Sequence, residues 1–587
     1  MEAEDRAAVE RLHEAWNELI AEGGAFEVVE ADVRGIPMRT FKSVLPNMRA
    51  MWELASLNGD KPYIVFEDEQ YSYAEIGARV RSLAHLLRDT YDIGSGDRVA
   101  VAMRNYPEWI ISYWATVSLG AAVVGMNAWW TGTELSYALE DSTPKVLICD
   151  KERLEALRPE LDRLRQSSPL PVITVRFDGD LPAEALRWED VIDPASAPES
   201  LPEAQIDPDD DATIFYTSGT TGFPKGAQIT HRGSVHNVFH LIFWAFVQGS
   251  AEAKKPVDPD NEPEESTQLI DTSGDNQNVF LAPTPLFHVT ACNCLFHPAT
   301  LAGGRLVLMY KWDAARALEL IERERVTNFS GVPTMGRELI LHPDWATRDT
   351  SSLKSIAGGG APMQPDLVEK IEKKLSGAAP STGYGLTETT GIVTVNSAQY
   401  FTSKPTSCGP LVPTLEAKLV DEAGNDLPPG PDTIGQLCVR GPVVIKGYLN
   451  RPDATAESIK DGWFNTGDIG FIDEDGFVTL VDRAKDMVLR GGENVYCAEV
   501  EAAIYRHPAV LEAAVFGVPD ERLGEKVAAV VVTAADGELD QATLSDFVSK
   551  DLAPFKVPEV VWFRTEPLPR NANGKFLKRE LREQVLD

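Results

Sequence analysis

The segment of the sequence most suited to chemistry is residues 217–226, TSGTTGFPKG. It follows an apolar run, ATIFY, combines Ser and Thr hydroxyls with three glycines, and ends in Lys225, whose movement Pro224 restricts. So many hydrogen-bond donors beside a cation suit a multiply charged anion, and polyphosphate is the natural ligand. A Walker loop is excluded because Lys225 lies three residues after Gly222 and is followed by Gly226 instead of Ser or Thr. The alternative is a plain surface turn.

Four further segments carry polar residues in a fixed order along the chain. They are STGYGLTET (381–389), GWFNTGD (462–468), DRAKDMVLRGGENVYCAEVE (482–501) and PRNANGK (569–575). Together with the glycine-rich loop they resemble the motifs of the adenylate-forming (ANL) superfamily, which includes acyl-CoA synthetases, amino-acid adenylation domains and beetle luciferases. Matching segments run from about Trp52 to about Arg579. Singly, each residue could cap a turn or pack in a core, but the order of all five motifs favours the family.

The resemblance implies a nucleotide site. The loop would hold the β- and γ-phosphates, Tyr384 would stack on adenine, and Thr387 would hydrogen-bond the α-phosphate. Glu388 would hold Mg²⁺, a cation that suits a single carboxylate plus waters. Asp468 would accept hydrogen bonds from the ribose hydroxyls. The implied ATP-binding residues are Thr217, Ser218, Gly219, Thr220, Thr221, Gly222, Lys225, Tyr384, Gly385, Thr387, Asp468 and Arg483.

One position departs from the family pattern. Thr382 stands where the family often has Asn or Gln. The contact to the adenine amino group expected from that position is therefore not carried over.

The implied reaction joins a carboxylate to the α-phosphate of ATP, and these two anions repel each other. Catalysis then depends on positioning and on cations aimed at developing negative charge. By resemblance, Lys575 would reach both the carboxylate and an α-phosphate oxygen, and His288 in TPLFHV would stand at the mouth of the acyl pocket. The implied catalytic residues are Lys575, Thr387, Glu388 and His288.

Small and apolar segments are expected to line the acyl pocket. The residues implied by resemblance are His288, Val289, Val332, Gly359, Gly360 and Ala361. Cys292 and Cys294 lack metal partners at suitable spacing, so we expect them only to pack. No Asp is found where amino-acid-activating domains keep one, which favours a fatty or aryl acid.

Strand-like runs alternate with helical ones from Pro62 to about residue 380, as in doubly wound parallel sheets. After Gly409 the pattern becomes rich in short strands. We therefore predict an α/β protein with a large N-terminal domain of two doubly wound subdomains plus a small β-barrel-like subdomain, followed by a small mobile α/β domain. Residues 1–45 look like an amphipathic helical lead-in, and the acidic stretch 248–278 like a surface insertion without a catalytic role.

The domain boundary is predicted after Asp482. Residues 1–482 would form the large adenylation domain, with the nucleotide-binding core at 46–482, and residues 483–587 the small domain. By resemblance the small domain rotates about Lys485 between the two half-reactions. The loop with Gly491, Gly492 and Glu493 would approach the pantetheine arm of CoA, because glycines allow close backbone approach. The alternative is a plain linker with a β-turn.

Charge and composition exclude other classes. The chain has 55 basic and 90 acidic residues, a net charge of −35, which opposes nucleic-acid binding. Six scattered cysteines and an acidic N-terminus without a signal-peptide pattern predict a cytoplasmic protein. The uncharged run from Trp109 to Trp130 is better explained as a buried helix closed by Gly120 and a buried strand than as a membrane span. A homodimer is compatible with the sequence.

These features predict an ATP- and Mg²⁺-dependent acid–thiol ligase that activates a medium- or long-chain fatty acid to acyl-AMP and transfers it to CoA. An aryl acid is the alternative substrate. A carrier protein or an intramolecular nucleophile is the alternative acceptor. A non-enzymatic adenylate-binding module is disfavoured, because a binder has no need of Lys575.

Overall fold

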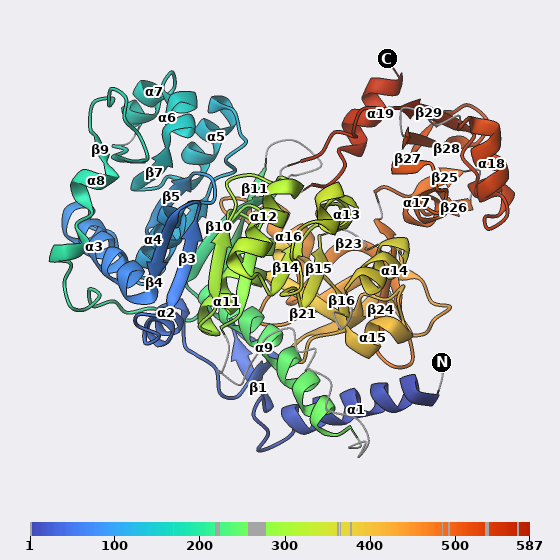
Figure 1. Cartoon of the computed structure of the whole chain (residues 1–587), viewed down its shortest axis with the longest axis horizontal. Helices are drawn as coiled ribbons and strands as arrows, with labels where there is room; N and C mark the ends of the chain where they lie inside the picture. Colours follow the sequence, from blue (N-terminus) through green and yellow to red (C-terminus); the bar gives the residue numbers. More distant parts are fainter. Residues whose placement is uncertain are drawn as a thin grey trace.

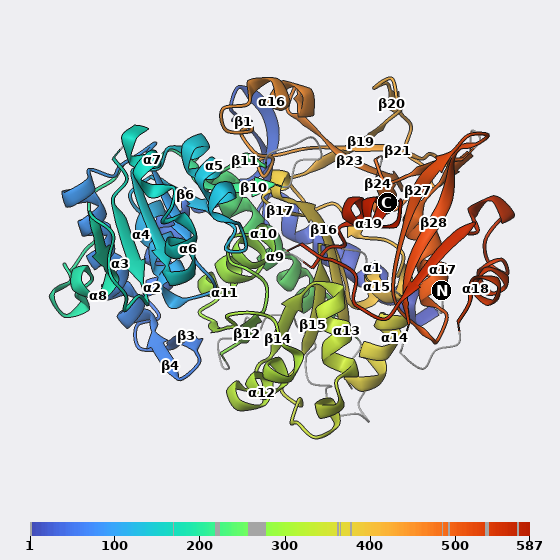
Figure 2. The same ribbon diagram turned by 90° about the horizontal axis from the view of Figure 1, so that it is seen from above.

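The computed structural model describes residues 3–586 except 168, 218–223, 256–276, 361–362, 364, 376–378, 484, 491–492, 534–538 and 572–573. It shows a mixed α/β protein with a large N-terminal and a small C-terminal domain, as predicted (Figure 1). The small domain lies at the opposite end of the molecule from the first sheet in both ribbon views (Figures 1 and 2).

The first subdomain is a seven-stranded sheet that is parallel except for the antiparallel pair β10 and β11 at one edge. Its order is β11 (Lys225–Thr230), β10 (Asp211–Thr217), β6 (Ala122–Gly125), β5 (Arg98–Ala102), β7 (Val146–Asp150), β8 (Val172–Val175) and β9 (Ala185–Arg187).

Helices cover both faces of this sheet because alternate side chains of a strand leave opposite faces. Val99 and Val101 of β5 pack in the cluster that contains α3 (Tyr73–Tyr91) and α4 (Pro107–Val117). Ala100 of the same strand packs on the other face of the sheet with α5 (Gly132–Ser142), α6 (Lys151–Leu157) and α7 (Leu161–Ser167).

The predicted buried helix and strand near Trp109 are α4 and β6, separated by Gly120 with a φ of 75°. None of the described helices combines the length and apolar character needed to span a membrane.

The second subdomain is an eight-stranded sheet, parallel from β16 to β3 and antiparallel at both edges. Its order is β17 (Gly391–Ser397), β16 (Ala379–Leu386), β15 (Ser355–Gly359), β14 (Asn328–Gly331), β12 (Val279–Ala282), β13 (Arg305–Leu308), β3 (Pro62–Phe66) and β4 (Glu69–Ser72). Its helices include α9 (His231–Ala253), α11 (His297–Leu301), α12 (Ala314–Glu324), α13 (Pro333–Leu341) and α14 (Pro365–Lys374).

The third subdomain is an antiparallel sheet, and it corresponds to the predicted β-rich region. Its order is β18 (Gly409–Pro410), β24 (Phe477–Arg483), β23 (Trp463–Ile472), β21 (Gly435–Arg440), β19 (Glu416–Val420) and β20 (Asp426–Leu427), with β22 (Ile459–Lys460) beside β23. Gly476, with a φ of 79°, lies in the turn between β23 and β24.

The small domain contains a five-stranded sheet with helices α17 (Cys497–Tyr505), α18 (Gln541–Val548) and α19 (Lys578–Leu586). Its strands are β26 (Glu493–Val495), β25 (Val488–Arg490), β28 (Gly524–Thr533), β27 (Val510–Asp520) and β29 (Val560–Arg564).

The N-terminal lead-in is helical only in its first part, which corrects the prediction. Helix α1 (Ala3–Ile20) is followed by an antiparallel hairpin of β1 (Val28–Val33) and β2 (Ile36–Phe41). The turn uses Gly35, whose φ of 81° suits glycine. Helix α1 lies beside α9 and α15 (Ala398–Ser403) at the bottom of Figure 1.

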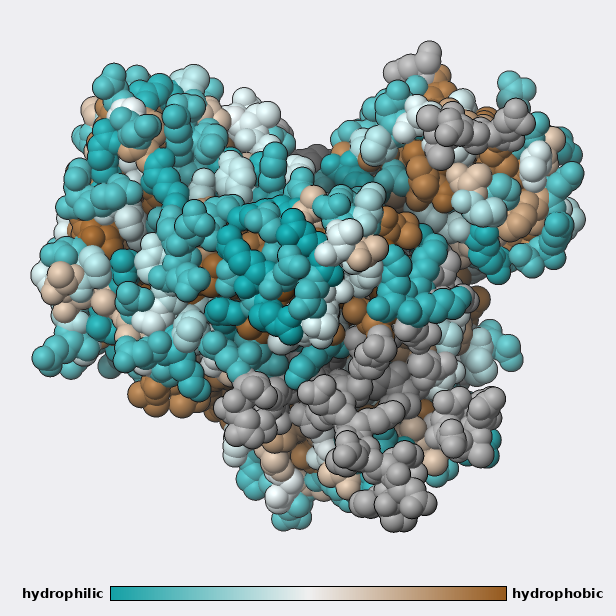
Figure 3. Space-filling view, in the orientation of Figure 1, coloured by the Kyte–Doolittle hydropathy of each residue, from teal (hydrophilic) through white to brown (hydrophobic). Residues whose placement is uncertain are grey.

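Side chains on the face shown in Figure 3 are mostly hydrophilic, in keeping with the net charge of −35.

Candidate active site

The predicted phosphate loop connects two antiparallel strands. Thr217 ends β10, Lys225 begins β11, and the two residues pair across the hairpin. The remaining predicted loop residues, Ser218, Gly219, Thr220, Thr221 and Gly222, lie outside the described residues. The hairpin therefore brings Thr217 and Lys225 together at the end of the first sheet.

Tyr448 joins two of the predicted site residues and was missed by the sequence analysis. Its hydroxyl donates to Oε1 of Glu388 at 2.8 Å, and the Nζ atom of Lys225 lies 5.1 Å from the centre of its ring. Burial, together with the Glu388 carboxylate, raises the pKa of Tyr448. No motif marked this residue, because a tyrosine in a β-rich region is ordinarily part of the core.

Thr387 and Glu388 lie in a short 3₁₀ turn (Thr387–Thr389) between β16 and β17. The chain is crowded there: a Cβ atom at Gly385 would lie 1.6 Å from the carbonyl oxygen of Gly391. The backbone N–H of Ile445 donates to the carbonyl of Glu388 at 3.0 Å. The second and third subdomains thus meet at the predicted metal-binding residue.

Asp468 receives contacts from two other predicted nucleotide residues. It faces Arg483 across β23 and β24, with Nε of Arg483 at 3.2 Å from Oδ1. The Tyr384 hydroxyl donates to Oδ2 of Asp468 at 2.5 Å. Burial and the nearby carboxylate raise the pKa of Tyr384 well above its usual value. This direct link between the predicted adenine and ribose residues was not anticipated from the sequence.

Thr382, where the sequence departs from the family pattern, lies beside this group. Its hydroxyl donates to the carbonyl of Gly358 at 3.3 Å.

Lys575 of the small domain lies against the large domain. Its backbone N–H donates to Oδ1 of Asn571 at 3.0 Å, which holds the turn before it. A Cβ atom at the neighbouring Gly574 would lie 2.8 Å from Cγ2 of Val332, and one at Gly360 would lie 3.9 Å from Cε of Lys575. The lysine segment therefore contacts the carboxyl ends of β14 and β15 in the second sheet, beside the predicted acyl site.

The charge environment of Lys575 places it near the nucleotide residues. Burial, Arg483 and Lys485 lower the pKa of Lys575 to about 8, opposed by the carboxylates of Asp468 and Glu388. The structure thus brings the terminal lysine together with residues from the 381–389 and 462–468 motifs.

His288 lies close enough to Lys575 to respond to its charge. Burial and, to a lesser extent, Lys575 lower the pKa of His288 to about 3, so the imidazole is neutral near pH 7. Its Nε2 atom is buried without a hydrogen-bond partner in the part of the chain that the structure describes. A buried polar atom of this kind is suited to a substrate group.

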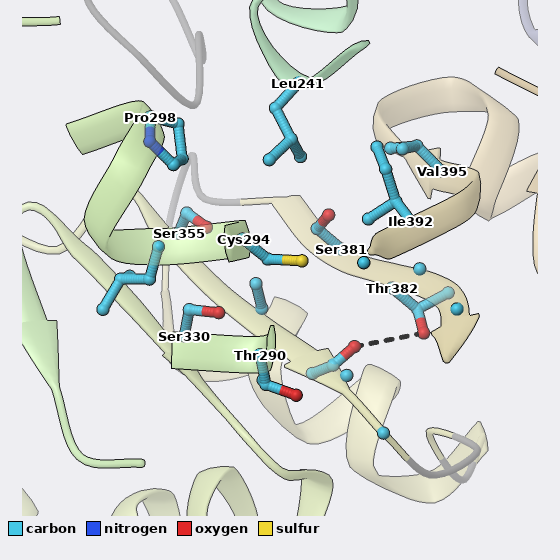
Figure 4. Close-up of a pocket in the computed structure, with 18 of the residues that line it drawn as sticks. Leu241, Thr290, Cys294, Pro298, Ser330, Ser355, Ser381, Thr382, Ile392 and Val395 are labelled. Atoms are coloured by element: carbon cyan, nitrogen blue, oxygen red, sulfur yellow. Dashed lines mark hydrogen bonds between the residues drawn. The ribbon is translucent and has the colours of Figure 1, made fainter. Parts of the chain in front are cut away.

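A cavity of about 190 Å³ lies between α9 and the second sheet (Figure 4). Of the residues predicted for the acyl pocket, Val289, Gly359 and Gly360 line this cavity, whereas His288 and Val332 are not among its lining residues and Ala361 lies outside the described residues. Tyr384 and Gly385 border the cavity as well, so it opens toward the predicted nucleotide residues.

Most of the cavity wall was not predicted, because nearly all of it comes from segments without motifs; Ser381 lies in a motif but was not assigned to the acyl pocket. The lining residues that the sequence analysis missed include Leu241, Trp244, Ala245, Phe280, Cys294, Leu295, Pro298, Asn328, Phe329, Ser355, Ser381, Ile392 and Val395. Cys294 corrects the expectation that both nearby cysteines only pack: it lies on a π-helical turn (Cys292–Phe296) and faces the cavity (Figure 4).

The predicted hinge lies between β24 and β25. Lys485 is exposed there, Glu493 is exposed at the start of β26, and Gly491 and Gly492 lie outside the described residues. Asp482, at the end of β24, accepts a hydrogen bond from the backbone N–H of Cys497 at the start of α17. The two domains are therefore in contact at this point of the chain.

These features define an adenylate-forming enzyme: two α/β subdomains, a β-subdomain, and a small domain that places Lys575 near Glu388 and Asp468 of the large domain. The family described as AMP-binding enzyme matches residues 51–449, and the AMP-binding enzyme C-terminal domain matches residues 499–575. The chain belongs to the AMP-binding enzyme family and is an AMP-forming acid–thiol ligase.

Two curated relatives and one solved structure illustrate the similarity. A feruloyl-CoA synthase from Amycolatopsis sp is 36% identical over 515 residues, covering 87% of this chain and 94% of the relative. A long-chain-fatty-acid–CoA ligase from Bacillus subtilis (strain 168) is 32% identical over 574 residues, covering 94% of this chain and 95% of the relative. The ATP-bound MatB structure from Rhodopseudomonas palustris has a TM-score of 0.76 at 30% identity, covering 91% of this chain and 99% of MatB.

Proposed function

We propose that the enzyme joins a carboxylic acid to the α-phosphate of ATP with release of pyrophosphate, and then transfers the acyl group to the thiol of CoA with release of AMP. The observation that carries this proposal is the position of Lys575 near Glu388 and Asp468 and beside the cavity that Gly360 lines. There its ammonium can offset the repulsion between the carboxylate and the phosphate.

Glu388 is the proposed Mg²⁺ ligand. The described residues contain no group of three His, Cys, Asp or Glu side chains that could hold a metal ion by themselves. A single carboxylate fits a cation that is bound mainly by substrate phosphates and water. Mg²⁺ would neutralise phosphate charge there, while Tyr448 orients the carboxylate.

The proposed substrate is a compact aryl acid, the alternative that the sequence left open. Ser330, Ser355 and Ser381 line one wall of the cavity, and their hydroxyls make no hydrogen bond within the described part of the chain (Figure 4). A saturated chain would desolvate these hydroxyls without pairing them, whereas a ring hydroxyl could donate to or accept from them and a methoxy oxygen could accept. The similarity to a feruloyl-CoA synthase supports this choice.

A medium-chain fatty acid is the second candidate, favoured by the apolar part of the cavity lining. Leu241, Trp244, Ile392 and Val395 present an apolar surface to the cavity. The cavity volume of about 190 Å³ is below the usual ~300–1,000 Å³ of ligand sites, which disfavours a long chain.

The proposal is tested with a panel of aryl and aliphatic acids. Acid-dependent exchange of labelled pyrophosphate into ATP measures adenylation, and consumption of CoA thiol measures transfer. We expect hydroxylated or methoxylated aryl acids to be preferred. Exchange without CoA consumption would indicate a carrier protein or an intramolecular nucleophile as acceptor, and no exchange with any acid would contradict adenylation.

The hydroxyl wall has its own test. Ser355→Ala should reduce kcat/KM for a ring-hydroxylated acid relative to its unsubstituted parent by about fivefold to tenfold, because a neutral hydrogen bond contributes about 1 kcal/mol. An unchanged ratio would favour the fatty-acid candidate.

A further inference from the structure

Helix α1 lies before the region that the family matches cover, and it packs behind the acyl cavity. The first match begins at residue 51, whereas α1 ends at Ile20. Leu12 and Ala15 of α1 are buried in the same hydrophobic cluster as the cavity-lining residues Trp244 and Val395. One continuous apolar core therefore joins this N-terminal helix to the substrate cavity.

Trp244 lies at the inner end of the cavity, away from the nucleotide residues. In the register of β16 and β17, Leu386 pairs with Gly391 next to the 3₁₀ turn, and Ser381 pairs with Ser397 at the other end. The indole N–H of Trp244 donates to Oγ of Ser397 at 2.6 Å. The tryptophan thus limits the cavity where the far end of an acyl group would lie.

Side chains of α1 support Trp244 from behind. The ring of Trp16 lies 6.2 Å from Trp244 and 4.7 Å from Phe243, edge to face in both cases. Trp244 stacks on Tyr400 at 5.4 Å, and His13 of α1 contacts Tyr400 at 5.3 Å. Such aromatic packing restricts the indole to one orientation.

Ion pairs fix α1 along α9. The Nζ atom of Lys254, just after the end of α9, lies 2.7 Å from Glu18 and 3.3 Å from Glu14. The helix is therefore held in place on both sides of Trp16.

We propose that α1 forms the outer support of the inner end of the cavity, and that Trp16 is a positioning residue that sets the length of the accepted acid by holding Trp244. This inference rests on the proposed function, because acid length matters only if the cavity receives the acyl group. Removing the Trp16 ring opens space into which Trp244 can move, which lengthens the cavity.

The test compares acids that differ only in length. The probes are ω-phenylalkanoic acids with one to six methylenes and straight-chain acids of four to twelve carbons, assayed by pyrophosphate exchange. Each methylene that becomes accommodated is worth about fourfold in kcat/KM. We expect Trp16→Ala to shift the ratio of longer to shorter acids by at least about fourfold, with the KM for ATP unchanged.

Three variants complete the design. Trp244→Ala should shift the ratio of longer to shorter acids further in the same direction. Trp16→Phe, which keeps an aromatic ring, should stay close to the wild-type ratio. Trp345→Ala is the matched control: it removes a partly buried tryptophan packed in another hydrophobic cluster, and we expect it to leave the ratio unchanged.

The outcomes separate the inference from the proposed function. A wild-type ratio in Trp16→Ala, beside a shifted ratio in Trp244→Ala, would overturn the support role of α1. A rise in the KM for ATP together with failure of Trp16→Phe to restore the ratio would show a merely structural role and would overturn it too. Absence of exchange by the wild-type enzyme with every acid would refute the proposed function and the inference with it.

Discussion

Raising the pH should slow adenylation because Lys575 loses its proton, and the pKa of Lys575 sets the midpoint of this fall in rate. Burial and neighbouring cations lower the pKa of this ammonium to about 8 from its ordinary value of 10.5. The protonated fraction then falls from about 0.9 at pH 7 to about 0.1 at pH 9. Because the charged form is the one that stabilises the transition state, kcat/KM for pyrophosphate exchange should fall about tenfold over this range.

The variant Lys575→Arg isolates this effect. Arginine stays protonated at every pH of the experiment, so its profile should remain level from pH 7 to 9 even though its absolute rate is lower. Lys575→Ala should lose about 10²–10³-fold at pH 7, the usual cost of removing one charge-stabilising donor. The rate of thioester formation from supplied acyl-AMP is the control, and it should be little changed. An alkaline limb that persists in Lys575→Arg, or a wild-type midpoint near 10.5, would refute the reasoning.

Three further predictions follow from neighbouring contacts. Tyr448→Phe should raise the KM for magnesium–ATP at least about tenfold, because Glu388 loses a hydrogen bond to a charged group, which contributes about 1.5–3 kcal/mol; an unchanged KM would mean that Tyr448 does not orient this carboxylate. Asp468→Asn should weaken ATP binding, measured by calorimetry, by at least about tenfold, because hydrogen bonds to a charged group contribute about 1.5–3 kcal/mol; wild-type affinity would exclude the ribose role. Burial lowers the pKa of His231 to about 3, so the unfolded chain gains a proton below pH 6.5 that the folded chain does not, and stability is lost as the pH falls. Between pH 7.5 and 5.5 this histidine should cost about 1.4 kcal/mol in urea unfolding, and His231→Gln should remove that share; an equal pH dependence in the variant would contradict it.

Local patterns in the sequence were sufficient to predict the fold class, and they pointed to most polar residues of the proposed site. The alternation of apolar strands and helices predicted the two layered sheets, because periodicity depends on residues within a few positions of one another. The helix–Gly120–strand unit shows this, since α4 and β6 form where the uncharged run was divided. Thr387, Glu388 and Asp468 were predicted as site residues because each lies in a short continuous motif.

The shape of the proposed substrate cavity and the support of its side chains were decided by tertiary structure. Tyr384 meets Asp468 across 84 residues, and Tyr448 meets Glu388 across 60, with no local pattern to mark either contact. Trp244 lines the cavity only because α9 packs against the second sheet, and Trp16 contacts Trp244 only because α1 packs on α9. A motif records chemistry that a few neighbouring residues share, whereas the size of a cavity depends on side chains from distant segments that only the packed chain brings together.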